Sequence, residues 1–143
     1  MIRPRRLRQA AFIRNMARET RLTADNLIQP LFVAEGDLAG PIASMPGLAR
    51  LTPAQLIAEC RELHRLGVPA VALFPVTPQE KKSDDGAEAL NPDSLMVRSI
   101  KAIKDAVPEL GVIADVALDP YTSHGHDGIL DANGYVANEA TCE

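Results

Sequence analysis

Three short apolar runs alternate with two longer stretches of helical periodicity in the middle of the chain. The apolar runs occupy residues 27–33, 70–74 and 111–117, and each is nearly continuous. Runs of this kind are typical of strands that are buried on both faces of a parallel sheet. Pro30 makes the first run the weakest of the three, because proline cannot donate a ladder hydrogen bond. The alternation of strands and helices predicts an α/β fold.

The first helical stretch has clear signals at both ends. Thr52 is a good N-cap, Pro53 fits the first helical position, and Gln55 completes a capping box. Gly67 supplies the C-terminal stop. Between these signals, apolar residues at helical spacing form the stripe that is expected to be buried: Leu56, Cys60, Leu63 and Leu66.

The second helical stretch follows a long polar loop at residues 77–91. We expect it to begin at Pro92, behind an N-cap at Asn91. Its predicted buried stripe is Met96, Ile100, Ile103 and Val107. Polar and acidic residues therefore gather after the strands, at the edge where α/β folds place their functional sites.

The segment at residues 115–128, which begins inside the third run and continues into a loop, concentrates residues that can perform chemistry: Asp115, Asp119, His124, His126 and Asp127. Alternation along a strand would put Asp115, Ala117 and Asp119 on one face, and a turn at Gly125 and Gly128 would return Asp127 to the same place. Clustered carboxylates can act as acid or base, hold an ammonium group or bind a hard cation. In the alternative interpretation, the aspartates are turn residues and the histidines are exposed or bonded to the backbone.

Composition limits the class of protein. The chain has 143 residues, enough for one ordinary domain, and is 46% hydrophobic but 3% aromatic, so we expect an aliphatic core. No apolar run approaches a membrane span, and the basic N-terminus lacks the apolar region of a signal peptide, so the expectation is a cytoplasmic protein with no membrane partner. Cys60 and Cys142 have no metal-binding or disulfide spacing.

Charge is divided unevenly along the chain. Residues 1–21 hold seven Arg and one Glu, a formal +6, whereas the remainder carries about −10. A solvated arm, or an arm docked on an acidic partner surface, is favoured over nucleic-acid binding, because the segment lacks interleaved aromatic residues and any known module.

Seven segments of the chain together resemble one enzyme family, delta-aminolevulinic acid dehydratase, also called porphobilinogen synthase. The match spans nearly the whole sequence, and the loop described above is its most specific motif. The segments are "RPRRLR", "RETRL", "LIQPLFVAEG", "PIASMPG", "GVPAVALFPV", "ALNPDSL" and "DVALDPYTSHGHDG".

The resemblance implies a fold and an activity. The fold is a (β/α)8 TIM barrel preceded by an extended N-terminal arm. Residues 1–26 would be the oligomerisation arm of a homo-octamer, and residues 27–143 the N-terminal portion of the catalytic barrel, with about three of its parallel strands. The activity is that of a lyase, which condenses two 5-aminolevulinate molecules to porphobilinogen in tetrapyrrole and heme biosynthesis.

The resemblance also assigns site residues. Asp115 matches an active-site aspartate that is expected to contact the substrate amine, while Phe74, Asp119, Asp127 and His126 are expected in the substrate pocket. Core packing is the alternative role for Phe74. The two Schiff-base lysines of the family lie beyond residue 143, and Lys81, Lys82, Lys101 and Lys104 match no family lysine motif. The chain alone is therefore expected to be catalytically incomplete; the alternative function is a non-catalytic assembly fragment that self-associates through the arm and open barrel edges.

Metal use follows from the same motif. Many family members have three zinc-binding cysteines at the positions of Ala117, Asp119 and Asp127. Carboxylates suit magnesium better than zinc. The resemblance thus points to the aspartate-type, zinc-independent branch, with magnesium at a site outside this segment and with Asp119 and Asp127 as candidate metal ligands.

Overall fold

The computed structural model describes residues 5–143. Five strands form one sheet in the order β2-β3-β1-β4-β5. The three central elements of the prediction are present as β1 (Ile28–Val33), β4 (Ala70–Pro75) and β5 (Gly111–Ala114), joined by the helices α2 (Pro53–Arg65) and α3 (Leu95–Ala106). The short strands β2 (Gly40–Pro41) and β3 (Ala49–Leu51) lie in the loop between β1 and α2.

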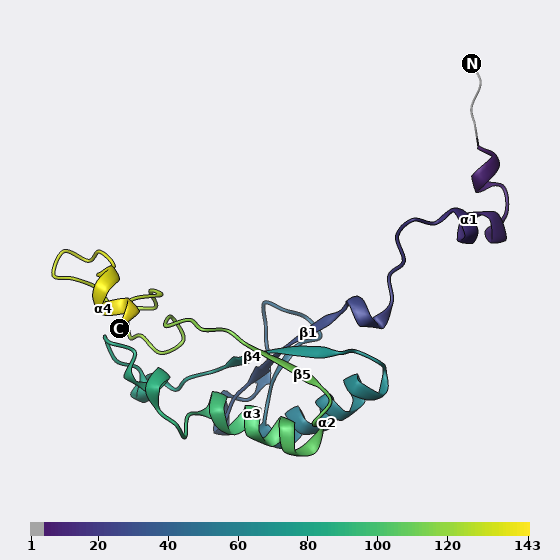
Figure 1. Cartoon of the computed structure of the whole chain (residues 1–143). Coiled ribbons are helices and arrows are strands. Elements are labelled where there is room, and N and C mark those ends of the chain that lie inside the picture. The colour runs from purple at the N-terminus through teal and green to yellow at the C-terminus, as the bar shows by residue number, and fades with distance from the viewer. Residues whose placement is uncertain (1–4) are drawn as a thin grey trace.

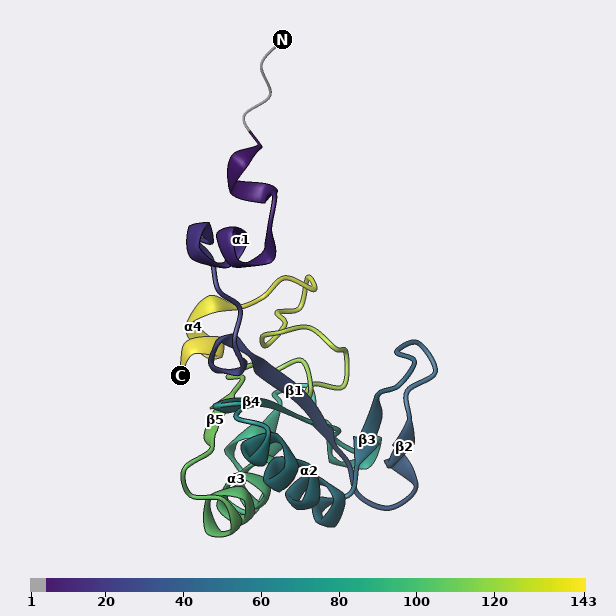
Figure 2. The same cartoon turned by 90° about the vertical axis from the view of Figure 1, so that its right-hand side faces the viewer.

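Most neighbouring strands run parallel, which confirms the predicted α/β fold. β4 pairs in parallel with β1 on one side and with β5 on the other, and Leu73 lies opposite both Leu31 and Ala114. β3 is also parallel to β1, whereas β2 is antiparallel to β3. The crossovers through α2 and α3 place both helices on the same side of the sheet (Figures 1 and 2).

The core fills the space between this sheet and the two helices. Alternate strand residues point into it, and the helices meet them with their apolar stripes. Its buried members are mostly Leu, Val and Ile, as the composition predicted: Leu31, Val33, Leu56, Cys60, Leu63, Val71, Leu73, Ile103, Val107 and Leu110 are among them.

The prediction that these strands are buried on both faces was wrong. Ile28 is 55% exposed and Ile113 is 46% exposed, and Phe32 and Phe74 are half-buried. The reason is geometric: both helices pack on one face, so the residues that alternate to the other face stay uncovered within the described chain. We call this the open face of the sheet.

Helix α2 begins and ends as predicted. Thr52 accepts a hydrogen bond from the Gln55 N–H at 3.3 Å, and the Gln55 side chain accepts one from the Thr52 N–H at 2.9 Å. Gly67 adopts φ +83°, which ends the helix. Leu66 was wrongly placed in the buried stripe: it is 56% exposed, because it is the C-cap and lies beyond the last turn that faces the sheet.

Helix α3 begins three residues later than predicted. Its N-cap is Ser94, whose hydroxyl accepts a hydrogen bond from the Val97 N–H at 3.4 Å. Asn91 instead closes a turn, in which its side chain accepts from the Asp93 N–H at 2.9 Å and its carbonyl from the Ser94 N–H at 3.0 Å. The predicted stripe is otherwise confirmed, with Ile100 only partly buried.

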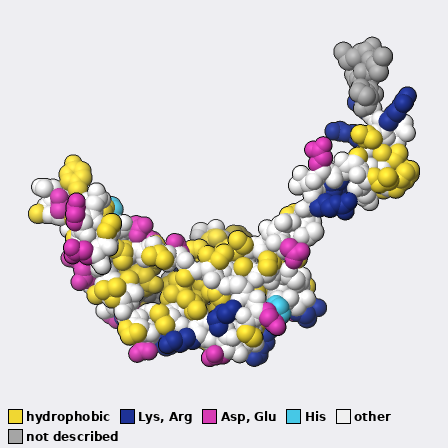
Figure 3. All heavy atoms as spheres, in the orientation of Figure 1, with side chains coloured by type: hydrophobic (Ala, Val, Ile, Leu, Met, Phe, Trp, Pro, Cys, Tyr) yellow, Lys and Arg dark blue, Asp and Glu magenta, His cyan; other side chains and the backbone are white. Residues whose placement is uncertain are grey.

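The chain before β1 extends away from the sheet (Figure 1). It contains the helix α1 (Ala11–Ala17), and its larger apolar side chains are exposed, including Leu7, Phe12, Met16 and Leu22. Figure 3 shows hydrophobic side chains beside basic ones at its outer end. The predicted arm starts at residue 1, so its first four residues lie outside the described residues. Within residues 5–143, no helix is both long and apolar enough to cross a membrane.

Candidate functional site

The loop of interest leaves the sheet one residue before Asp115. The pairing of β5 with β4 ends at Ala114, and Asp115 is exposed. The prediction of a strand reaching residue 117 was therefore wrong, and the strand alternation that would align Asp115, Ala117 and Asp119 does not operate. Beyond Ala114 the chain no longer follows the edge of β4, and by residues 118–120 it has entered a turn.

Asp127 nevertheless returns to the start of the loop, as the turn at Gly125 and Gly128 suggested. Its carboxylate accepts a hydrogen bond from the backbone N–H of Leu118 at 2.6 Å. Gly125 adopts φ +75°, a conformation that favours glycine and allows the chain to reverse. The loop is thus closed on itself, with Asp127 beside the residues that follow Asp115.

Asp115 and Asp127 line the same hollow, which has a volume of about 520 Å³. Its walls come from the end of β5, the start of α3 and the buried ring of Tyr121, and most of its lining is apolar. Hydrophobic side chains gather over this part of the molecule in Figure 3. Two carboxylates at the rim of an apolar hollow can hold a cationic group of a ligand whose carbon chain lies inside.

The other predicted site residues lie apart from this hollow. Asp119 and His126 are exposed on the loop, and the His126 ring lies 5.5 Å from the ring of His124. Phe74 belongs to the open face of the sheet, where its ring packs against Phe32 at a centroid distance of 5.6 Å. Phe74 therefore packs against one neighbouring strand and remains partly exposed, instead of being buried in the core.

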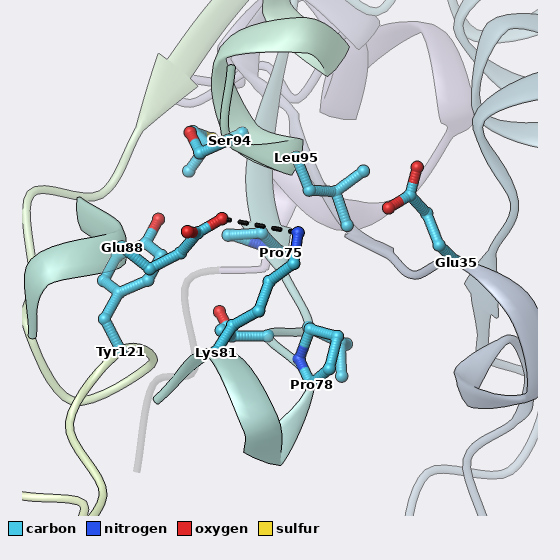
Figure 4. A pocket seen from close by; sticks show the side chains of 11 residues that line it. Glu35, Pro75, Pro78, Lys81, Glu88, Ser94, Leu95 and Tyr121 are labelled. Carbon is cyan, nitrogen blue, oxygen red and sulfur yellow. Dashed lines mark ion pairs between the residues drawn. The ribbon is translucent and has the colours of Figure 1, made fainter. Parts of the chain in front are cut away.

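A second, smaller pocket was not anticipated from the sequence. It lies beside the hollow, and Figure 4 shows Lys81 pointing toward Glu88, with Tyr121 next to Glu88 and Glu35 on the opposite side. Lys81 Nζ lies 3.7 Å from Glu88 Oε1. Burial, and secondarily the Glu88 charge, raises the pKa of Tyr121. No local sequence motif indicates this pocket, because it is assembled from five separate segments of the chain.

An ion pair borders the small pocket on the Glu35 side. The Arg98 guanidinium, on α3, donates to both carboxylate oxygens of Glu35 at 2.9 and 3.1 Å. These hydrogen bonds lower the pKa of Glu35 against the opposing effect of its partial burial. The pair links the loop after β1 to α3, so it holds two of the chain segments that surround the site.

The three positions at which the resemblance implies cysteines hold no thiolate in this chain. Ala117 offers no ligand atom, and the Asp127 carboxylate is already engaged by the Leu118 N–H. Among residues 5–143, no group of three or more His, Cys, Asp or Glu side chains is arranged to hold a metal ion. A zinc centre normally requires three or four such ligands.

Comparison with known proteins assigns the chain to a family. A family model described as "Delta-aminolevulinic acid dehydratase" matches residues 1–143. The delta-aminolevulinic acid dehydratase of Bradyrhizobium diazoefficiens is 48% identical over 141 residues, which are 98% of this chain and 40% of that protein. The chloroplastic enzyme of Selaginella martensii is 47% identical over 140 residues, which are 97% of this chain and 34% of the relative.

A solved structure has the same fold. The crystal structure of the Toxoplasma gondii ME49 enzyme, in complex with its reaction product porphobilinogen, superposes with a TM-score of 0.93 at 42% identity. It covers 99% of this chain, which in turn covers 40% of that one. The chain thus spans well under half the length of these relatives. With the family model matched from the first residue to the last, the chain belongs to the delta-aminolevulinic acid dehydratase family.

Proposed function

We propose that the polypeptide represented by this chain is a porphobilinogen synthase, a lyase that condenses two molecules of 5-aminolevulinate with loss of water. Its product would feed tetrapyrrole and heme synthesis. The observation that carries this proposal is the convergence of Asp115 and Asp127 on one hollow at the carboxyl end of β5. The family match over all 143 residues and the product bound to the Toxoplasma relative support the substrate class.

Asp115 is the proposed contact for the substrate ammonium group. Its exposure after the last paired residue of β5 leaves the carboxylate accessible to a ligand, and a carboxylate can form a charge-assisted hydrogen bond with an ammonium group. Asp127, Asp119, His126 and Phe74 are proposed to contribute to the substrate pocket. Phe74 faces the open side of the sheet, which in a closed barrel becomes the interior.

The open face and the free edge of β5 support a further part of the proposal. The three parallel strands and their two helices form the first part of a (β/α)8 barrel, and the remaining strands come from the rest of the longer protein. Residues 1–26 form an arm that packs on a neighbouring subunit of a homo-octamer. The exposed Phe12 and Met16 give this arm an apolar surface, and the formal charge of +6 on its residues 1–21 complements the acidic remainder of the chain.

The proposed enzyme belongs to the zinc-independent branch. The alanine and two aspartates at positions 117, 119 and 127 support this assignment, since carboxylates favour hard cations. Magnesium is proposed as its metal, bound outside the segment described here. We also propose a cytoplasmic location; the two free cysteines, Cys60 and Cys142, are compatible with a reducing compartment.

Covalent trapping tests the proposal that the Schiff-base lysines lie outside this 143-residue chain. Schiff-base formation joins a lysine amine to the substrate ketone and expels water, and it requires an unprotonated amine in a dry pocket. Lys81 is paired with Glu88, and Lys104 donates to the backbone carbonyls of Pro108 and Leu110. We therefore expect borohydride and 5-aminolevulinate to leave the 143-residue chain unmodified in mass spectrometry, and to modify the longer polypeptide. A stable adduct on a lysine of this chain would contradict the proposal.

Three further measurements test the metal branch, the role of the arm and the alternative of a non-catalytic assembly fragment. Turnover that survives a zinc-selective chelator is expected of the longer polypeptide, and loss of turnover that zinc alone restores would contradict the branch assignment. Deleting residues 1–21 should reduce the oligomeric mass in light scattering. Concentration-dependent assembly without porphobilinogen formation in any preparation would favour the assembly fragment.

A further inference from the structure

The loop that carries Asp119 and Asp127 is fastened to a second loop, residues 82–87, far away in the sequence. Ser83 and Thr122 form an isolated parallel bridge, in which the Ser83 N–H donates to the Tyr121 carbonyl at 3.1 Å. The Ser123 N–H donates in turn to the Ser83 carbonyl at 3.0 Å. The Ser123 hydroxyl donates to the carboxylate of Asp84. The two loops therefore form one hydrogen-bonded unit.

The second loop is itself well ordered by internal bonds. The Ser83 hydroxyl donates to the Asp85 carboxylate at 2.6 Å and accepts from the Ala87 N–H at 3.0 Å. Gly86 has φ +66°, and a Cβ there would lie 3.3 Å from the Leu118 side chain. The glycine thus permits both the turn and the close approach of the two loops. Residues 82–87 can serve as a fixed support for the loop that contains Asp127.

His124 bridges the two loops through its imidazole ring. Its Nε2 lies 3.2 Å from the backbone carbonyl oxygen of Asp84, 40 positions earlier in the chain. Because a carbonyl can only accept, Nε2 must carry the hydrogen in this contact. Its Nδ1 lies 3.2 Å from the backbone N–H of His126, which can only donate. Both contacts are satisfied together by one neutral tautomer, with the hydrogen on Nε2.

The same contacts fix the residue that precedes Asp127. The His126 N–H is held by the His124 ring, and its carbonyl accepts from the Thr122 hydroxyl at 2.8 Å. Thr122 is fully buried, so this hydroxyl has little freedom. With both backbone groups of His126 held, the next residue is presented to the Leu118 N–H, which Asp127 binds at 2.6 Å.

We infer that His124, as the Nε2–H tautomer, is a positioning residue that sets the placement of Asp127 through the link to Asp84. The inference deepens the proposed function, on which it rests for the role of Asp127 in the substrate pocket. The hydrogen bond from Nε2–H to the Asp84 carbonyl is the essential contact, because it links the two loops. The hydrogen bond that Nδ1 accepts from the His126 N–H requires that Nδ1 carries no hydrogen.

Two substitutions separate these contacts. His124→Gln can still donate from the position of Nε2 to the Asp84 carbonyl, whereas His124→Asn can only replace the local acceptor at Nδ1. His64→Asn is the matched control, because His64 lies on the distant helix α2 and is partly exposed. Nitrogen-15 NMR of the 143-residue chain at pH 8, where imidazoles are ordinarily neutral, should show the Nε2–H tautomer for His124. The Leu118 amide resonance should move in the asparagine variant and stay in place in the glutamine and control variants.

Kinetics of porphobilinogen formation by the longer polypeptide complete the test. His124→Asn should lower kcat/KM about 10- to 100-fold, the scale expected from misplacing a group by about an ångström. His124→Gln should stay within about threefold of the unsubstituted enzyme, as should His64→Asn. Equal losses in the glutamine and asparagine variants, or an Nδ1–H tautomer, would overturn the inference.

The NMR measurements do not depend on turnover, so they test the inference even if the longer polypeptide forms no porphobilinogen. If the asparagine variant loses its far-UV circular dichroism, Ser123→Ala replaces it as a second way to weaken the loop pairing. An unmoved Leu118 amide in Ser123→Ala would then overturn the inference, as the Nδ1–H tautomer in the unsubstituted chain would by itself.

Discussion

The two faces of the sheet differ sharply although they are built from the same three strands. On the covered face, Val33, Val71 and Leu73 are fully buried beneath α2 and α3. On the open face, Ile28 and Ile113 remain about half exposed, and Phe32 and Phe74 pack against each other but are only half-buried. The covered face therefore holds this part of the molecule together, and the open face is where the rest of the proposed barrel, or a ligand, can be accommodated.

The largest expected effect on stability comes from truncating an isoleucine in the covered core and comparing it with the same change on the open face. Ile103→Ala, in the covered core, should destabilise the chain by about 2–5 kcal/mol, because it removes buried methyl groups and leaves a cavity. Ile113→Ala, on the open face, removes the same atoms from a residue that is 46% exposed and should cost less than half as much. Urea unfolding followed by circular dichroism measures both, and equal losses would show that the open face is packed in solution.

Thiol reactivity probes the covered side without changing the sequence. Cys60 is fully buried on α2, and burial raises the pKa of its thiol to about 11. At pH 8 roughly one part in a thousand of such a thiol is ionised, so its alkylation should be at least about 100-fold slower than that of an accessible thiolate. Cys142 is exposed and serves as the internal control. Mass spectrometry should find a single modification on Cys142 before denaturant is added and two afterwards; rapid early loss of the Cys60 thiol would mean that α2 opens readily.

The smallest expected effect on stability concerns the Glu35–Arg98 ion pair, which joins the loop after β1 to α3. A carboxyl with a lowered pKa in the folded chain stabilises the fold above its unfolded pKa, and this stabilisation is lost as the pH falls through the folded value. Arg98→Gln should therefore cost under about 1 kcal/mol at pH 7, since both side chains are more than 40% exposed, and nothing once Glu35 is protonated. Unfolding at several pH values measures the difference; Arg65→Gln, which removes the exposed pair with Glu62, is the matched control. A difference that persists in acid would assign the effect to packing of the Arg98 side chain.

Local signals in the sequence located the start of a helix correctly where only one residue was a good candidate for the N-cap. The capping box at Thr52 and Gln55 located α2 because both partners lie within one turn. Asn91 and Ser94 are both good capping residues, and the sequence offered no way to see that a turn would occupy Asn91.

Of the predicted site residues, Asp115 and Asp127 line one hollow, but the arrangement of the loop that carries them was not predictable. The return of Asp127 followed from nearby glycines, whereas β5 ends at Ala114 although β4 continues to Pro75 beside it, and no local pattern indicated this end. The support from residues 82–87 could not be inferred, because hydrogen bonds between two loops leave no periodic pattern. The exposure of the open face was missed for a related reason. An apolar run indicates that a strand can be buried, but it does not indicate which element, if any, packs on each of its faces.

The order of strands has a consequence for biosynthesis. β1, β4 and β5 lie side by side in the order in which they are translated, and each crossover is closed by the helix between its two strands. A ribosome would therefore release β1, α2 and β4 as a unit that can pair and begin to bury its apolar stripe before α3 and β5 emerge, in keeping with the N-terminal-first folding of nascent chains. Each later strand then adds to an edge that already exists, so growth of the sheet requires no earlier pair to separate.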